Sequence, residues 1–263
     1  MAIITLTSDY GSGSHYIGAL KGAILNKIPG AQVIDISHQT DKFNHEQLAF
    51  VLAGVYKNFP KGTWHLLAID TSVFVHKQIL VIEHEGHYFI GADNSVFNFL
   101  FPVKPTKIYR LILKPADDKE LFPEKNIFID AIAQFAKKGD LKGIAEPAQI
   151  NRDVMVHAPF YEGNLLRGRV IFIDSFDNAH TNIHKKLFDE CIGGSPFKIH
   201  LWKRSRLDFI ASSYQSERDG EEVAVFNSNG FLEIGMSRGR GAQLMGLSAN
   251  AKIMIEKLNR DDS

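Results

Sequence analysis

Two carboxylates stand directly after segments that have the pattern of buried strands. Asp9 follows the apolar run Ile3–Thr7, and Asp70 follows the run Trp64–Ile69. Ligands of α/β proteins bind at the carboxyl ends of the sheet strands, so we expect both side chains to line one cleft. A carboxylate in a cleft can accept hydrogen bonds from a ligand or act on water as an orienting group or base.

The elements that must position these residues alternate between strand and helix in the first part of the chain. Apolar residues recur at helical spacing from Ile17 to Ile28, from Leu48 to Phe59 and over Ile127–Ala136, with strand-like runs between them. This alternation predicts an α/β domain over residues 1–157 with a mostly parallel sheet.

The pattern changes after about Val156, where helical spacing gives way to short strand-like segments separated by turn residues. These segments are Arg169–Ile173, Phe197–Trp202, Glu222–Phe226, Phe231–Met236 and Ala251–Leu258. Closely spaced strands predict a small β-barrel-like domain over residues 158–263, which would form the other wall of a cleft.

Composition excludes several classes of partner and cofactor. The 263 residues carry 30 basic and 30 acidic side chains, so neither nucleic acid nor an anionic membrane is an expected partner. The single cysteine, Cys191, excludes an intrachain disulfide and a cysteine-based zinc site. His180 and His184 have a helical spacing that suits zinc, but we expect them to be surface or wall residues and expect no metal. With no signal-like segment, we expect a cytoplasmic protein.

Eight motifs, spread in order over nearly the whole chain, resemble those of the S-adenosylmethionine hydroxide adenosyltransferases, relatives of the fluorinases and chlorinases. They are TSDYG at 7–11, YIGALKG at 16–22, VIDISH at 33–38, FPKGT at 59–63, DN at 93–94, IDSFDN at 173–178, TNI at 181–183 and NSNGFLEI at 227–234.

The resemblance implies an enzyme that splits S-adenosylmethionine into adenosine and L-methionine by attack of water at the ribose C5′, with no cofactor beyond this substrate. It also implies a homotrimer in which the substrate lies between the N-terminal domain of one subunit and the C-terminal domain of its neighbour. The stretch between Asp70 and Asp93 is too short for the fluorinase insertion, so halogenation is disfavoured.

The resemblance further assigns six residues to the substrate. Asp9 would grip the ribose, Phe43 would cover the ligand, Asp174 would hold the amino group, Asn178 would read the adenine edge, Tyr214 would lie against adenine, and Ser228 would hold the methionine carboxylate. Each has a structural alternative: a helix N-cap for Asp9, core packing for Phe43, and a β-turn for Asp174 and Asn178. For Tyr214 and Ser228, a purely structural role stays open.

The catalytic residues depart from the family pattern. Asp70 is retained, Lys77 stands in place of an arginine, and the family histidine is absent from the segment Phe122–Lys125. One interpretation is hydrolysis by Asp70 and Lys77, with His76 or Glu124 as the base, although lysine lacks the planar fork of arginine.

The alternative is a protein of the same fold that binds adenosine or S-adenosylmethionine without turnover, or that acts on another leaving group. The sequence therefore leaves open whether the chain is an enzyme. An unrelated α/β-hydrolase is a third class, and the lack of a Gly-x-Ser-x-Gly motif counts against it.

Overall fold

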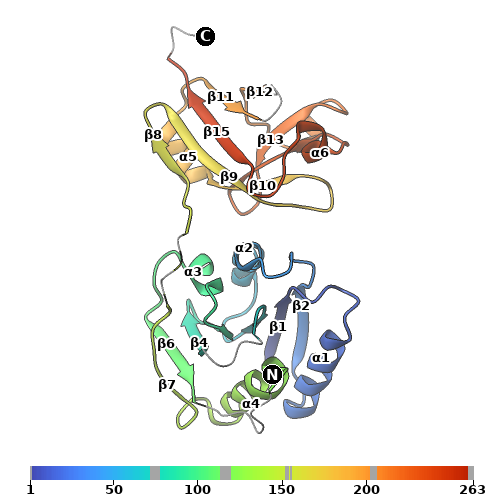
Figure 1. Ribbon diagram of the computed structural model, residues 1–263, viewed down its shortest axis with the longest axis vertical. Coiled ribbons are helices and arrows are strands. Elements are labelled where there is room, and N and C mark those ends of the chain that lie inside the picture. The colour runs from blue at the N-terminus through green and yellow to red at the C-terminus, as the bar shows by residue number, and fades with distance from the viewer. Residues whose placement is uncertain are drawn as a thin grey trace. The chain divides into compact units, whose positions relative to one another are not determined.

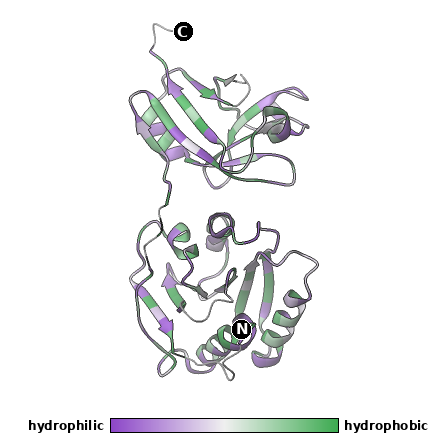
Figure 2. Cartoon of the chain, viewed as in Figure 1, coloured by the Kyte–Doolittle hydropathy of each residue, from purple (hydrophilic) through white to green (hydrophobic). Residues whose placement is uncertain are grey.

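The chain forms two compact units, residues 1–156 (unit 1) and 157–263 (unit 2), in a computed structural model (Figure 1). The structure describes residues 2–71, 78–112, 120–151, 154, 156–201 and 206–259. In each unit, apolar residues recur along the strands and on the helices (Figure 2). No helix in the described part of the chain has the length and apolar character needed to cross a membrane.

Unit 1 is built on a seven-stranded sheet with the strand order β2-β1-β3-β5-β4-β6-β7. Its strands are β1 (Ile3–Ser8), β2 (Gln32–Ser37), β3 (Trp64–Ala68), β4 (Ile79–His84), β5 (His87–Ala92), β6 (Lys107–Leu111) and β7 (Ala145–Pro147).

This sheet is mixed, which corrects the prediction of a mostly parallel one. Strands β2, β1, β3 and β5 are parallel, whereas β4, β6 and β7 pair antiparallel. The cause is a tight hairpin at Glu85 and Gly86, which both have positive φ (51° and 85°). Such a turn forces β4 and β5 to run antiparallel, and the apolar run of β4 alone cannot reveal its direction.

Helices cover both faces of this sheet and bury two apolar clusters. On one face α1 (His15–Lys27) and α4 (Ile129–Lys138) pack on the strands, and on the other α2 (His45–Ala53) and α3 (Val96–Leu100) do so. The short helices η1 (Tyr56–Asn58) and η2 (Glu124–Phe128) follow α2 and precede α4, respectively. This layering leaves the carboxyl ends of β1 and β3 at one edge of the unit, where loops can build a site.

Unit 2 is an antiparallel half-barrel of eight strands around its own apolar core. Seven follow the order β12-β11-β15-β9-β10-β14-β13, and β8 pairs with β9. The elements are β8 (Phe160–Glu162), β9 (Leu165–Ile173), β10 (Ala179–His184), α5 (Lys185–Ile192), β11 (Phe197–His200), β12 (Arg206–Leu207), η4 (Tyr214–Ser216), β13 (Glu222–Phe226), β14 (Phe231–Met236), α6 (Gly241–Met245) and β15 (Lys252–Lys257).

Candidate functional site

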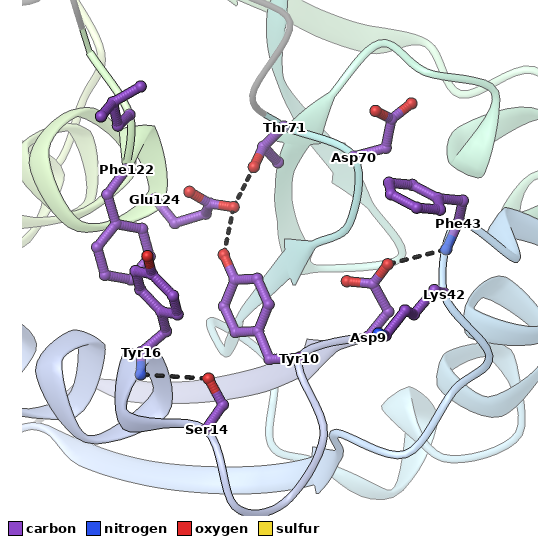
Figure 3. A pocket seen from close by; sticks show the side chains of 11 residues that line it. Asp9, Tyr10, Ser14, Tyr16, Lys42, Phe43, Asp70, Thr71, Phe122 and Glu124 are labelled. Atoms are coloured by element: carbon purple, nitrogen blue, oxygen red, sulfur yellow. Dashed lines mark hydrogen bonds between the residues drawn. The ribbon is translucent and has the colours of Figure 1, made fainter.

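A cavity of about 360 Å³ opens beyond the carboxyl ends of β1 and β3 in unit 1 (Figure 3). Asp9 and Asp70 both line it, as their places after these strands predict. The remaining lining residues are Tyr10, Ser14, Tyr16, Lys42, Phe43, Thr71, Leu121, Phe122 and Glu124. The cavity is large enough for a small organic ligand.

Asp9 holds the segment that carries Phe43. Its Oδ2 accepts a hydrogen bond from the Phe43 backbone N–H at 2.9 Å (Figure 3). Phe43 has a φ of 60°, a rare value for a bulky residue, and its side chain is 67% exposed. Asp9 is not the N-cap of α1, because Ser14 fills that position and accepts from the Tyr16 N–H. The structure therefore excludes the helix cap for Asp9 and core packing for Phe43.

Asp70 is fixed through its backbone as well as its side chain. It has a φ of 46°, and the buried Asn94 donates through Nδ2 to the carbonyls of Ile69 (2.5 Å) and Asp70 (3.3 Å). His45 Nε2 lies 3.5 Å from Asp70 Oδ2. Asn94 belongs to the DN motif at 93–94, but neither it nor His45 was assigned a role from the sequence, because both contacts depend on how distant segments pack.

Glu124 is the buried carboxylate of this cavity, with only 1% of its surface exposed. Its Oε1 accepts hydrogen bonds from the Tyr10 hydroxyl (2.7 Å) and from the Thr71 hydroxyl (Figure 3). Burial raises the pKa of Glu124, the charge of Asp9 adds to this rise, and the two hydroxyl donors oppose it. The structure thus places one of the two candidate bases in the cavity. Lys77 and His76 lie outside the described residues, so their roles stay predictions.

A second cavity, of about 670 Å³, lies in unit 2 and brings together three of the predicted binding residues. Asp174, Asn178 and Tyr214 line it, and Ser228 does not; it lies exposed in the turn between β13 and β14. The other lining residues are Phe176, Gln215, Glu233, Met236, Ser237, Arg238, Gly239 and Arg240.

The Asp174–Asn178 turn is shaped by its own side chains. Asp174 Oδ1 accepts from the backbone N–H groups of Phe176 and Asn178, each at 2.9 Å, so the turn role predicted for these residues is real. Asn178 also lies against Gly235 of β14, where an added Cβ would come within 2.2 Å of Asn178 Oδ1. A glycine is needed there for Asn178 to reach its place.

His180 and His184 do not form the helical pair that their spacing suggests, because both lie on strand β10. Residues four apart on a strand are separated by about 13 Å, too far to share one zinc ion. His184 instead caps α5 by accepting from the Lys186 N–H at 3.1 Å. An interval of four residues puts two side chains on one face of a helix, but the interval alone does not show whether the residues lie on a helix or on a strand.

Both units match models of a known family. The N-terminal domain model of the SAM hydroxide adenosyltransferases covers residues 4–145, and the C-terminal domain model covers residues 168–254. The chain belongs to the SAM hydroxide adenosyltransferase family.

Relatives in this family extend over almost the entire chain. An (R)-S-adenosyl-L-methionine hydrolase of Methanocaldococcus jannaschii is 29% identical over 96% of this chain and 95% of its own. One of Thermus thermophilus is 21% identical, covering 97% and 100%, and a fluorinase of an Actinoplanes species is 20% identical, covering 97% of each. An uncharacterised Thermotoga maritima protein of solved structure has the same fold, with a TM-score of 0.86 and 24% identity over 97% of this chain and 100% of its own.

The contacts of Glu124 predict how its titration responds to substitution. Thr71→Val and Tyr10→Phe each remove a donor to the charged carboxylate, so each raises the pKa of Glu124 further. Carbon-13 NMR of side-chain carboxyls, recorded against pH, measures this pKa, with Glu124→Gln to assign the signal. Tyr16→Phe is the matched control, because no bond from the Tyr16 hydroxyl to Glu124 is seen. If both substitutions left the pKa of Glu124 unchanged, the hydrogen bonds from Tyr10 and Thr71 to this carboxylate would be contradicted.

Proposed function

We propose that this protein hydrolyses S-adenosylmethionine to adenosine and L-methionine with a catalytic set that differs from the family pattern. Its membership of the family supports this, as do relatives named (R)-S-adenosyl-L-methionine hydrolase. The observation that carries the proposal is the buried Glu124, a carboxylate with a raised pKa in the same cavity as Asp70.

The reaction needs an activated water molecule and no acid. The water oxygen forms a bond to the ribose C5′, the bond between C5′ and sulfur breaks, and its electron pair stays on sulfur. Methionine leaves as a neutral thioether, so the leaving group needs no proton. The proton that water loses must pass to a base, and a carboxyl group of raised pKa is a stronger base than an exposed one.

The residues of unit 1 divide these tasks. Asp9 accepts hydrogen bonds from the ribose hydroxyls, Asp70 orients the attacking water, and Glu124 takes its proton in place of the missing histidine. Tyr10 and Thr71 hold the Glu124 carboxylate in one orientation. Lys77 is proposed to supply positive charge where the family has arginine.

The charge of the cavity bears on binding more than on rate. Among the described residues that line it, three are carboxylates and Lys42 is the one lysine or arginine. The carboxylates attract the positively charged sulfonium and ammonium groups of the substrate. Because the sulfonium loses its charge in the transition state, this attraction favours the ground state. Acceleration must therefore come from aligning the water with C5′ and from excluding bulk water.

The residues of unit 2 are proposed to bind the rest of the substrate. Asp174 would hold the amino group, Asn178 the adenine edge, Tyr214 the adenine face and Ser228 the methionine carboxylate. We propose that these residues meet the unit 1 cavity of a neighbouring chain in a homotrimer, as the family resemblance implies.

Asp70→Asn and Glu124→Gln each lower kcat for adenosine formation by about 10²- to 10⁴-fold, the usual contribution of a positioned acid or base. Wild-type kcat/KM falls as the pH drops through the raised pKa of Glu124, because the base must be ionised, and this acid limb is lost in Glu124→Gln. Chromatography of the nucleoside product after incubation with S-adenosylmethionine measures both effects.

Glu83→Gln is the control, since Glu83 pairs with Lys107 away from the cavity. A wild-type protein that binds adenosine but forms none would contradict hydrolysis and favour the binding protein without turnover. Full activity in Glu124→Gln would show that another group is the base.

Mixing two inactive variants tests the shared site. Asp9→Ala damages the unit 1 cavity and Asp174→Ala the unit 2 cavity, so each variant alone forms a trimer without a complete site. When the two variants are co-expressed in equal amounts, about a quarter of wild-type activity returns. In random assembly, an intact unit 1 meets an intact unit 2 of the next subunit at about one interface in four. No recovery of activity would mean that each site belongs to one chain.

A further inference from the structure

A chain of polar contacts runs through the wall of the unit 2 cavity, beyond the residues to which the proposed function gives a role. The His180 ring lies between two carboxylates: Nε2 is 3.2 Å from Asp174 Oδ2, and Nδ1 is 3.4 Å from Glu233 Oε2. The Phe172 ring stacks on the imidazole with centroids 4.4 Å apart and planes 3° from parallel. This stacking fixes the plane in which the two nitrogens point.

Glu233 connects this histidine to the predicted adenine contact. It is buried on β14, and its Oε1 accepts a hydrogen bond from the Tyr214 hydroxyl at 2.6 Å. Burial, followed by this hydrogen bond, raises the pKa of Tyr214, so the phenol stays protonated and remains a donor. The orientation of the Tyr214 ring therefore depends on Glu233.

Glu233 also reaches the turn that carries Ser228. Its Oε2 accepts from Asn227 Nδ2 at 3.2 Å. Asn227 Oδ1 accepts in turn from the backbone N–H groups of Asn229 (3.0 Å) and Phe231 (3.1 Å), which fixes the turn around Ser228. One buried carboxylate thus links the histidine, the tyrosine and this turn.

The same side chains include ligand types that suit a metal ion, since atoms of Asp174, His180 and Glu233 lie within 4.8 Å of one another. The geometry favours hydrogen bonds instead. The two ring nitrogens face different carboxylates, whereas an ion would take one nitrogen with both carboxylates on its side. Both Glu233 oxygens already accept from Tyr214 and Asn227.

We propose that His180 and Glu233 are positioning residues for S-adenosylmethionine, an inference that rests on the proposed function. His180 orients the Asp174 carboxylate toward the ammonium group of the methionine part. Glu233 orients the Tyr214 ring toward adenine and steadies the turn that presents Ser228. Neither residue needs to touch the reacting atoms, so their loss weakens binding and spares the chemical step.

Calorimetric titration in an Asp70→Asn background, where turnover is slow, measures the binding of S-adenosylmethionine and of adenosine. His180→Gln weakens S-adenosylmethionine binding about 10-fold or more and adenosine binding less than about 3-fold, since adenosine has no ammonium group. Glu233→Gln weakens both. In the otherwise wild-type enzyme, KM rises by similar factors while kcat stays within about 3-fold.

His200→Gln is the matched control, because His200 also pairs with a carboxylate in unit 2, Glu256 at 2.8 Å, and neither lines the cavity. Its affinities stay at the background value.

A second check combines Glu233→Gln with Tyr214→Phe. Because Glu233 acts on adenosine through Tyr214, the double variant binds adenosine no more weakly than the worse single variant.

Three results would overturn the positioning role. The first is that His180→Gln and Glu233→Gln leave both affinities unchanged while the background protein binds both ligands. The second is that the effects of Glu233→Gln and Tyr214→Phe on adenosine affinity add fully. The third is stoichiometric zinc in the wild-type protein that the His180→Gln protein lacks. A wild-type protein that binds neither ligand overturns the proposed function together with the positioning role. A wild-type protein that binds both ligands, with variants that bind them equally well, overturns the positioning role alone.

Discussion

One carboxylate oxygen of Glu124 accepts two hydroxyl donors, and this interaction joins three segments of unit 1. Tyr10 follows β1, Thr71 follows β3, and Glu124 begins the helical segment that continues into α4. A buried carboxylate is costly unless it is hydrogen-bonded, so these segments cannot separate without leaving it unsatisfied. Asp9 and Asp70 are the chain neighbours of the two donors. The contact that satisfies Glu124 therefore also holds the other two carboxylates beside the same cavity.

Strained backbone accompanies both cavities. Phe43 and Asp70, which line the unit 1 cavity, and Arg238, which lines the unit 2 cavity, have φ values of 60°, 46° and 50°, in the left-handed region that disfavours residues with a Cβ. Such conformations persist where the surroundings hold them, and in unit 1 side-chain contacts do so: Asp9 accepts from the Phe43 N–H, and Asn94 donates to the Asp70 carbonyl. Groups that are already fixed need little rearrangement, which suits the proposed reaction because that reaction depends on alignment.

Sequence patterns predicted where the unit 1 cavity lies, but they predicted its chemical groups only in part. Asp9 and Asp70 followed from the rule that ligands bind at the carboxyl ends of strands. The direction of β4 did not follow, because a buried strand has the same apolar run in either direction. Glu124 was one of two candidate bases, and only packing shows its burial. Glu233 went unnoticed, because a glutamate within a strand gives no sign that its side chain lies inside the unit. The role of Lys77 stays a prediction.

The proposed reaction is attack of water on the ribose C5′ of S-adenosylmethionine. The most direct measurement is mass spectrometry of the products formed from S-adenosylmethionine in H₂¹⁸O. The account predicts adenosine that carries one ¹⁸O at the 5′ oxygen and methionine that carries none. Adenosine without label, label in methionine, or methylthioadenosine as the nucleoside product would contradict it.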